Sequence, residues 1–280
     1  MIYASDLDRT LIYSLSAIGV PEDSPGLVPA EIINGNIVSY ISREALLQLE
    51  RLVEHIVFMP VTTRTVQQYK RINLFQETII PDYAITSNGG NILIKGEVDR
   101  EWRETVGKLV ERHSAPAEEV RNRIWSVLRE EWVISERFCD DLFFTFVVQR
   151  DLLPVDLTAI LGDDLDVIGW SVSLQGRKLY AVPKAVSKSA AIGHVRRTVQ
   201  HEPMVASGDS LLDKCLLDAA DYAMVPCHGE IYAEHQSGLH QEKYLFTARS
   251  GVFASDEILQ YVSKIYNNSM ALGAGRYEKR

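Results

Sequence analysis

Several short apolar runs in this chain are each followed at once by polar residues, and this pattern restricts the possible folds most strongly. The runs have the length of strands and are too short for helices; they lie at 2–4, 56–61, 83–86, 204–206 and 222–225. Since both faces of these runs are apolar, they are typical of a parallel sheet buried between helices. Helical patterns lie between them, so we expect a doubly wound, parallel-sheet α/β core.

Two helices and one irregular stretch stand out in this core. Ser42 can cap a helix at 43–55, in which apolar residues recur on one side. A similar apolar side predicts a closing helix at 255–266. Residues 14–41 are rich in proline and glycine and are too long for a simple connection. We therefore expect a flap or loop excursion over the site at 14–41.

The pattern changes between residues 92 and 178. Candidate helices at 100–113 and 116–130 are followed by candidate strands around 143–148 and 167–174. The run at 143–148 has the β-branched and aromatic composition of a strand, and we interpret Trp102, Trp125 and Trp132 as packing residues. A chain of 280 residues exceeds the usual size of one domain. We therefore predict a core formed by 1–91 and 179–280 and an inserted α+β cap domain at 92–178.

Composition narrows the possible partners and compartments. The net charge of −9 offers no basic surface for a nucleic acid, so we expect none as a partner. No apolar run is long enough to cross a membrane. The N-terminus lacks the features of a signal peptide, and Cys139, Cys215 and Cys227 lie far apart without metal-site or disulfide spacing. These features favour a cytoplasmic protein, with the oligomeric state left open.

The polar residues at the strand ends are the candidate site, because ligands of an open parallel sheet bind beyond the carboxyl ends of its strands. Acids from two strands would meet there and repel one another in a low dielectric. A divalent cation removes this repulsion, and oxygen ligands with few carboxylates suit Mg²⁺. Such an ion would also let a carboxylate approach a phosphate dianion. The polar segments are 6–10, 62–64, 87–90 and 208–210 with Asp213 beyond.

Four short segments, in their order along the chain, resemble the four motifs of the haloacid dehalogenase superfamily. They are D-L-D-R-T from Asp6, the strand end at Thr62, Lys188, and G-D-S-L-L-D ending at Asp213. The insertion between the second and third motifs, and A-A-D-Y-A-M-V-P at 219–226, resemble the subgroup with the larger α+β cap. That subgroup includes Cof-type sugar phosphatases and sucrose-phosphate phosphatase. Three positions depart from its pattern: Arg9 and Thr63 replace glycines, and Leu212 replaces an asparagine.

The resemblance implies a Rossmann-like core and a magnesium-dependent phosphatase that acts on a small phosphorylated metabolite, such as a sugar phosphate. Asp6 would be the nucleophile and form an aspartyl-phosphate, and Asp8 would act as acid and base. Thr62 and Lys188 would bind the phosphoryl oxygens. The implied magnesium ligands are Asp6, the backbone carbonyl of Asp8, Asp209 and Asp213. The candidate substrate contacts are Arg9, Thr10, Thr63, Arg64, Asn88 and Ser210.

Several of these residues have structural alternatives. Asp213 is spaced from Ser210 as in a capping box and can support a helix start instead of a metal. Asn88, followed by two glycines, can form only a tight turn. Arg9 can reach a second anionic group of the substrate or can be a solvated side chain.

Two further alternatives concern the lysine and the function. Lys184 follows the same strand as Lys188, but Lys188 is preferred because Ser187 can cap a helix that begins there. The functional alternatives are a phosphomannomutase-like phosphotransferase and a non-catalytic regulator that binds a phosphorylated ligand.

Overall fold

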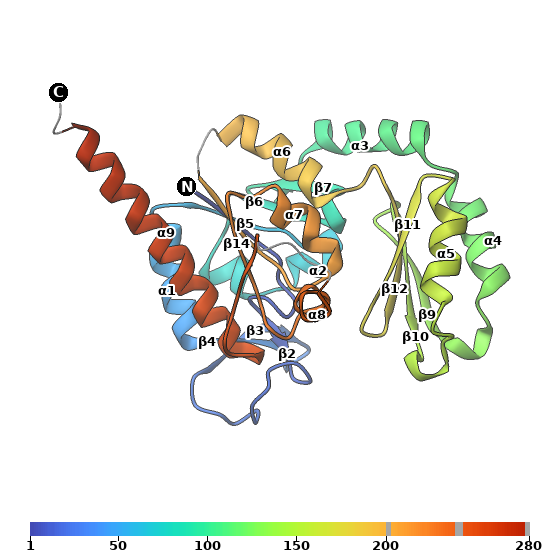
Figure 1. The fold of residues 1–280 in the computed structure, drawn as a ribbon, viewed down its shortest axis with the longest axis horizontal. Coiled ribbons are helices and arrows are strands. Elements are labelled where there is room, and N and C mark those ends of the chain that lie inside the picture. The colour runs from blue at the N-terminus through green and yellow to red at the C-terminus, as the bar shows by residue number, and fades with distance from the viewer. Residues whose placement is uncertain (200–202, 239–242, 278–280) are drawn as a thin grey trace.

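The computed structural model describes residues 1–199, 203–238 and 243–277, with only the backbone for 272–277. Its central layer is a five-stranded parallel sheet in the order β15-β14-β13-β1-β5. Helices cover both faces of this sheet (Figure 1), which confirms the predicted α/β fold class. The strands are β1 (Ile2–Ser5), β5 (Val57–Pro60), β13 (Met204–Ser207), β14 (Tyr222–Val225) and β15 (Leu245–Phe246).

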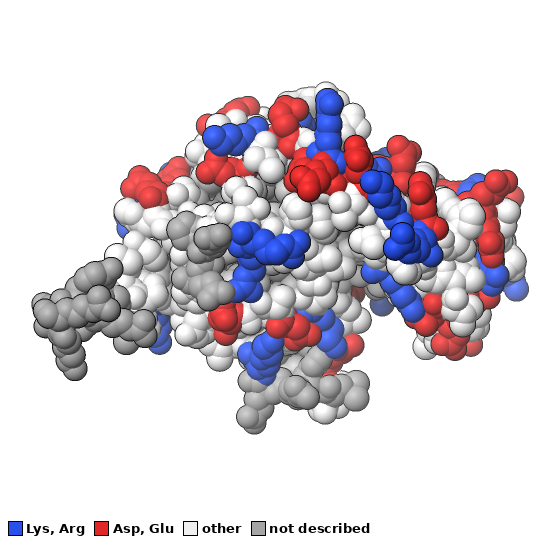
Figure 2. All heavy atoms as spheres, turned by 90° about the horizontal axis from the view of Figure 1, so that it is seen from above, with Lys and Arg blue, Asp and Glu red and all other residues white. Residues whose placement is uncertain are grey.

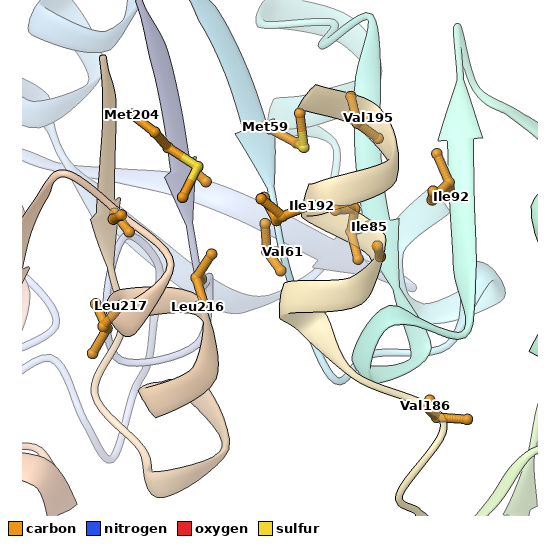
Figure 3. Packing of buried hydrophobic residues seen from close by; sticks show 14 of the residues in the cluster. Met59, Val61, Ile85, Ile92, Val186, Ile192, Val195, Met204, Leu216 and Leu217 are labelled. Atoms are coloured by element: carbon orange, nitrogen blue, oxygen red, sulfur yellow. The ribbon is translucent and has the colours of Figure 1, made fainter. Parts of the chain in front are cut away.

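The side chains of each central strand alternate between two buried clusters. In β1, Ile2 and Ala4 pack against helices α6 (Lys188–Val199) and α7 (Lys214–Asp218). Tyr3 packs on the other face, against α1 (Arg43–Val53) and α9 (Ala254–Tyr277). Figure 3 shows Ile192 of α6 close to the β5 strand on the first face. Because both faces are covered by apolar helix surfaces, the strands are apolar throughout.

The predicted strand at 83–86 differs from a regular member of this sheet. β6 (Tyr83–Thr86) lies beside β5 through a single parallel bridge between Val61 and Ile85. It otherwise pairs in antiparallel orientation with β7 (Asn91–Ile94), which in turn pairs with β8 (Glu97–Val98). The bridge at Val61 keeps the polar residues after β6 near those after β5.

Residues 14–41 match the predicted flap or loop excursion only in part: 15–26 are turns and irregular backbone, whereas strands follow from residue 27. β3 (Leu27–Ile33) and β4 (Asn36–Ser42) form an antiparallel hairpin, with β2 (Tyr13–Ser14) on the other side of β4. The turn residues Asn34 and Gly35 both have positive φ, 51° and 79°. Asn-Gly between β-branched runs is a strong hairpin signal, and the proline and glycine content of the segment masked it.

A second, four-stranded antiparallel sheet has the order β11-β12-β10-β9. Its strands are β9 (Val133–Cys139), β10 (Phe143–Val148), β11 (Trp170–Gln175) and β12 (Lys178–Pro183). Helices α4 (Ala117–Val127) and α5 (Leu157–Asp166) cover the face turned away from the core (Figure 1). The predicted helices and the strand at 143–148 are confirmed, whereas β11 begins three residues later than the predicted start at 167.

The polypeptide crosses between the two sheets at several points. Residues 179–183, assigned to the core by the predicted division, pair within the second sheet as part of β12. Trp102 of α3 (Arg100–His113), assigned to the cap, packs in the core cluster, and its indole N–H donates to the Gly89 carbonyl at 2.9 Å. The division into domains remains a prediction, and we propose that its second boundary lies after Pro183.

Two short helices, α2 (Val66–Lys70) and α8 (Glu230–Gln236), complete the core. Within the part of the chain that the structure describes, none of the helices has the length and apolar character needed to cross a membrane. On the face drawn in Figure 2, Lys and Arg side chains are interspersed with Asp and Glu side chains.

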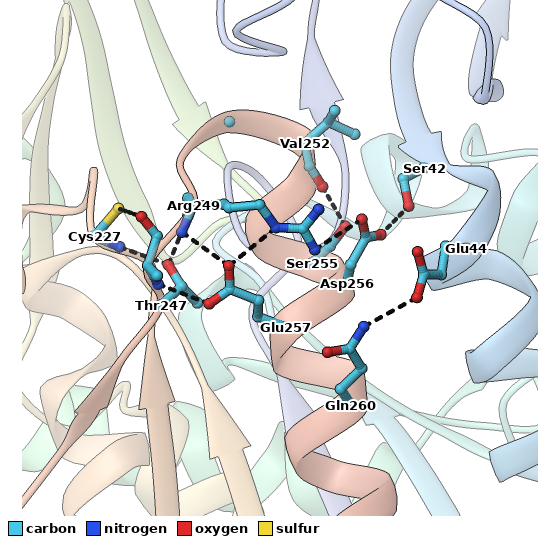
Figure 4. Close-up of polar contacts among 12 residues, drawn as sticks. Ser42, Glu44, Cys227, Thr247, Arg249, Val252, Ser255, Asp256, Glu257 and Gln260 are labelled. Carbon is cyan, nitrogen blue, oxygen red and sulfur yellow. Dashed lines mark hydrogen bonds and ion pairs between the residues drawn. The ribbon is translucent and has the colours of Figure 1, made fainter.

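Ser42 ties the start of α1 to the start of α9. Its hydroxyl oxygen accepts a hydrogen bond from the Ala45 amide at 2.9 Å and donates to the Asp256 carboxylate (Figure 4). Asp256 is only 2% exposed, and burial raises the pKa of this carboxyl while the Ser42 hydrogen bond opposes the rise. Ser42 therefore serves both as a helix cap and as the partner of a buried acid.

We expect Ser42→Ala to lower the free energy of unfolding by about 1–3 kcal/mol, because it removes a helix cap and leaves a buried carboxylate without its hydroxyl partner. Ser42→Thr keeps the hydroxyl and should lie close to the wild type. Urea unfolding monitored by circular dichroism measures the difference. Equal stability of the alanine variant and the wild type would contradict this role.

Candidate active site

Three aspartates meet at the carboxyl edge of the central sheet. Asp6 follows β1, and Asp209 and Asp213 follow β13, the neighbouring parallel strand. One carboxylate oxygen from each lies within 4.8 Å of the other two. All three are buried, with exposures of 6%, 6% and 0%. The register of the sheet causes this convergence, because Ser5 pairs with Ser207 and the Asp6 amide donates to the Ser207 carbonyl at 2.9 Å.

Lys188 is the cation inside this cluster. Its Nζ is fully buried and lies 2.7 Å from Asp6 Oδ1 and 2.5 Å from Asp213 Oδ1. It also donates to the Val61 carbonyl at 3.1 Å. Helix α6 begins at Lys188, and its first turn is capped by Ser187, which accepts from the Ala190 amide. The alternative, Lys184, instead pairs with Asp166.

One ammonium group does not balance three buried carboxylates. Burial and repulsion from Asp213 raise the pKa of Asp6 to about 7, although Lys188 opposes the rise. Burial and repulsion from Asp6 raise the pKa of Asp209 well above its usual value. Burial lowers the pKa of Lys188, but the two carboxylates outweigh this effect and leave it above its usual value. A divalent cation would relieve this excess of negative charge, because carboxylate oxygens are ligands that such hard ions prefer.

Asp8 lies apart from the three-acid cluster and is held by Arg64. The Arg64 guanidinium donates two hydrogen bonds to the Asp8 carboxylate, both at 2.8 Å, and a third to Glu31 at 2.7 Å. Desolvation raises the pKa of Asp8, but the Arg64 charge and its hydrogen bonds outweigh this effect and hold the pKa below its usual value. Asp8 is therefore kept ionised, in the form that accepts a proton.

Glu31 was not identified from the sequence. It lies on β3 of the hairpin and is 1% exposed, so it fixes the outer side of the Arg64 guanidinium. Arg64 was predicted to contact substrate, whereas the structure places its side chain between two carboxylates. Glu31 lies among β-branched residues, which favour a strand, but the interpretation of 14–41 as a loop left this strand unpredicted.

Arg9 occupies the position at which the resembling subgroup has glycine, and its φ is 62°. Its Nε lies 3.3 Å from Asp209 Oδ2, and its Nη2 donates to the His228 carbonyl at 2.9 Å. In return, His228 Nε2 donates to the Arg9 carbonyl at 2.9 Å, while His228 Nδ1 accepts from the Gly251 amide. These contacts offset a left-handed backbone that costs on the order of 1–3 kcal/mol. His228 was missed although it lies just after β14, a further strand end.

Asp213 forms the predicted capping contact and also lies in the acid cluster. Its Oδ2 accepts hydrogen bonds from the Ser210 amide at 3.0 Å and the Ser210 hydroxyl at 2.7 Å. The capping box is therefore confirmed. The other oxygen, Oδ1, binds Lys188 and stays within the acid cluster, so the capping contact does not remove Asp213 from the candidate metal site.

The remaining candidate residues surround the cluster. Thr62 is 1% exposed and its hydroxyl oxygen accepts from the Arg64 amide at 3.1 Å. Asn88 has φ of 56° in a tight turn, which confirms the turn, while its contact with substrate stays a prediction. Thr10 Oγ1 and Asn88 Oδ1 are buried atoms without a hydrogen-bond partner among the described residues. Thr63 lies beside Tyr180 of β12 and forms a side-chain hydrogen bond with it.

Two glycines allow the backbone to approach the charged residues closely. A Cβ atom on Gly208 would lie 2.5 Å from the Asp213 Cβ, and one on Gly89 would lie 2.2 Å from the Ser187 carbonyl oxygen. Both distances are far inside van der Waals contact. The space beside Asp213 and the start of α6 therefore exists only because these positions lack a side chain.

Known structures share this arrangement of layers. The sucrose-phosphatase from Synechocystis sp. PCC6803, solved with sucrose and phosphate, is 15% identical, with a TM-score of 0.64 over 93% of this chain and 97% of that chain. A sugar phosphatase of haloacid dehalogenase subclass IIB is 13% identical, with a TM-score of 0.56 over 94% and 98%. A haloacid dehalogenase-like hydrolase from Bacillus subtilis is 12% identical, with a TM-score of 0.51 over 93% and 90%.

No protein-family model and no curated protein sequence matches the chain. The structural similarity, at these low identities, establishes the fold: the chain has the haloacid dehalogenase fold with a cap, as its motifs predicted. The roles of individual residues remain predictions that rest on the motifs and on the geometry of the acid cluster.

We expect Gly208→Ala to displace Asp213 and to lower the free energy of unfolding by about 1–3 kcal/mol through overpacking. Its magnesium affinity, measured by calorimetry, should fall as well. Gly107→Ala is the matched control, since nothing lies within 4 Å of its Cβ position on α3 and alanine is the better helix former. Wild-type magnesium binding and stability in the Gly208 variant would contradict the close approach.

The stability of the metal-free protein should fall as the pH rises from about 5 to about 7.5. The pKa of Asp6 rises from 3.8 to about 7 on folding, so the folded state binds more protons than the unfolded state between these values. Stability then decreases with increasing pH in that window. The melting temperature across this range measures the effect.

Two further measurements separate the titration of Asp6 from the titration of other groups. Asp6→Asn should flatten the pH dependence, because the amide does not ionise. Added magnesium should raise the melting temperature more at about pH 7.5 than at about pH 5, since ionised carboxylates bind it. A metal-free melting temperature that increases steadily over this range would refute the raised pKa of Asp6.

Proposed function

We propose that this chain is a magnesium-dependent phosphatase that hydrolyses a small phosphorylated metabolite, with a sugar phosphate as the first candidate. The observation that carries the proposal is the burial of Asp6 together with Asp209, Asp213 and Lys188 at the carboxyl edge of the sheet. This arrangement supplies a carboxylate nucleophile beside a fixed cation and a set of oxygen ligands. Structural stability alone does not favour such a cluster, because burying several like charges is costly.

In the proposed reaction, an Asp6 carboxylate oxygen attacks phosphorus and forms an aspartyl-phosphate while the bond to the leaving oxygen breaks. Asp8 must first take up a proton when the substrate binds; it gives this proton to the leaving oxygen and, once ionised again, takes a proton from the water that attacks phosphorus and releases Asp6. Lys188 and Thr62 bind the phosphoryl oxygens. Magnesium, held by Asp6, Asp209, Asp213 and the Asp8 carbonyl, would neutralise the charge of the phosphoryl group.

Arg64 orients the carboxylate of Asp8, the acid and base of the proposed reaction. Its two hydrogen bonds fix the plane of the Asp8 carboxylate, and bidentate pairing of this kind restricts orientation as well as charge. Asp8 remains 48% exposed at its side chain. Arg64 thus holds one side of the Asp8 carboxylate, and the other side stays accessible to a leaving oxygen or to water.

The choice of substrate class draws on the structural neighbours. One neighbour is a sucrose-phosphatase solved with sucrose and phosphate, and another is a sugar phosphatase. Both match nearly the full length of this chain. We therefore propose a phosphorylated sugar or polyol as the first class to test.

We expect magnesium-dependent release of inorganic phosphate from p-nitrophenyl phosphate and from members of a sugar phosphate panel. Chelation should abolish the release, and Asp6→Asn should lower kcat by roughly 10³-fold or more, as removal of a nucleophile does. Asp163→Asn, on the exposed surface of α5, removes the same charge and should leave kcat unchanged.

The same assay separates the alternatives. A phosphotransferase would return the phosphoryl group to a sugar and would need a bisphosphate primer. A regulator would bind the phosphorylated ligand without turnover. Full activity of the Asp6→Asn protein would end the proposed mechanism whichever substrate is used.

A further inference from the structure

One face of the second sheet is turned toward the candidate active site. Side chains alternate along each strand: Phe144, Phe146 and Leu179 pack under helices α4 and α5, whereas Phe143 and Tyr180 pack in the core cluster. Burial raises the pKa of the Tyr180 hydroxyl, and the charges of the nearby aspartates at positions 6 and 8 add to the rise. The face that carries Tyr180 therefore borders the reacting groups.

The strand register arranges this face in two rows. Thr145 pairs with Arg137 on one side and Tyr180 on the other, and Tyr180 pairs with Ser173. The next row along the strands lies two residues further, about 7 Å away. It consists of Ser135, Val147, Lys178 and Gln175.

Arg137 and Lys178 are two cations on this face with no anionic partner among the described residues. Both are exposed. Their strands, β9 and β12, flank β10, and the register places the two residues on adjacent rows. The charge of Lys178 also lowers the pKa of Asp8, which places it within electrostatic reach of the site.

The opposite face of the same sheet shows a different pattern. Arg121 there pairs with Glu136 at 2.6 Å, and Arg123 pairs with Glu119 and with Asp164, each at 2.9 Å. The helix-covered side therefore balances its cations internally. On the side that borders the active site, Arg137 and Lys178 have no such partner within the described part of the chain.

Unsatisfied polar atoms accompany these cations. Ser173 Oγ and Gln175 Nε2 are both buried and lack a hydrogen-bond partner among the described residues. Buried polar atoms without partners are uncommon and require an explanation. An anionic ligand that bridges the two rows would supply partners for the two exposed cations.

We propose that Arg137 and Lys178 bind a second anionic group of the substrate, either a carboxylate or a second phosphate. The preferred substrate is then a phosphomonoester that carries another negative charge roughly one row of the sheet, about 7 Å, beyond Tyr180. This inference rests on the proposed phosphatase function. Arg9, the candidate from the sequence for this role, is already engaged by Asp209 and His228.

The test measures competitive inhibition of p-nitrophenyl phosphate hydrolysis by matched pairs of compounds. One pair is 3-phosphoglycerate and glycerol 3-phosphate, which differ by a carboxylate. A second is 6-phosphogluconate and glucose 6-phosphate, with the same difference on a longer chain. A third is fructose 1,6-bisphosphate and fructose 6-phosphate, which differ by a phosphate. Inhibition reports binding even where a compound is not hydrolysed.

In the wild type, the doubly anionic member of at least one pair should inhibit more strongly, by roughly 10- to 100-fold, the range of a charge-assisted hydrogen bond. Lys178→Met and Arg137→Met should each reduce this ratio, and Lys178→Arg should retain most of it. Lys108→Met, an exposed change on α3 with the same loss of charge, is the control and should leave the ratio unchanged. The pair that shows the largest ratio identifies a carboxylate or a phosphate.

Two results would overturn the inference. One is equal inhibition by both members of every pair in the wild type, and the other is an unchanged ratio in both methionine variants. The proposed function fails separately, through the absence of magnesium-dependent hydrolysis of p-nitrophenyl phosphate. Activity toward that reporter with no preference for doubly anionic compounds would therefore reject this subsite and keep the phosphatase.

Discussion

The central constraint of this molecule is the burial of three carboxylates around one ammonium group at the edge of a parallel sheet. Lys188 contacts two of the acids directly, and the remaining excess of negative charge raises the pKa of Asp6 and of Asp209 through burial and mutual repulsion. Such an arrangement opposes folding unless a ligand compensates it. The elements around it, from the order of the strands to the positions of the glycines, hold these groups together against that repulsion.

The strands that carry the acids are joined by hydrogen bonds as well as by the sheet ladder. The Tyr3 hydroxyl lies 2.9 Å from the Ser207 hydroxyl, which is 2.7 Å from that of Ser5, and Ser5 donates to the Asp6 carbonyl at 2.7 Å. All of these atoms are buried, where hydrogen bonds are stronger and their loss is costly. A polar link directly beneath the acids therefore fixes β1 and β13 where a purely apolar contact would allow small shifts.

The sequence predicted what depends on local pattern and on strand order. Apolar runs located the central strands, Ser42 located the start of α1, and residues following the strands located Asp6, Asp209 and Lys188. It did not predict the hairpin at β3 and β4, or the contact of Glu31 with Arg64. Such contacts join side chains that are distant in the sequence, and their partners are set by the packing of whole elements. The domain boundary stays a prediction, and we propose to move it beyond Pro183 because the pairing of β12 with β10 crosses residue 179.

Under the proposed function, the distribution of charge gives the two sheets separate parts in binding the substrate. The central sheet presents a cluster of acids that favours a metal cation, and Arg64 and Arg9 are each already paired with an acid at its rim. The facing sheet presents Arg137 and Lys178 without acidic partners in the described chain. One end of an anionic substrate between them would bind the metal cation held by the acid cluster. The other end would bind Arg137 and Lys178. A cation at each end would then fix the position of the substrate before reaction, because each anionic group is attracted to a different site.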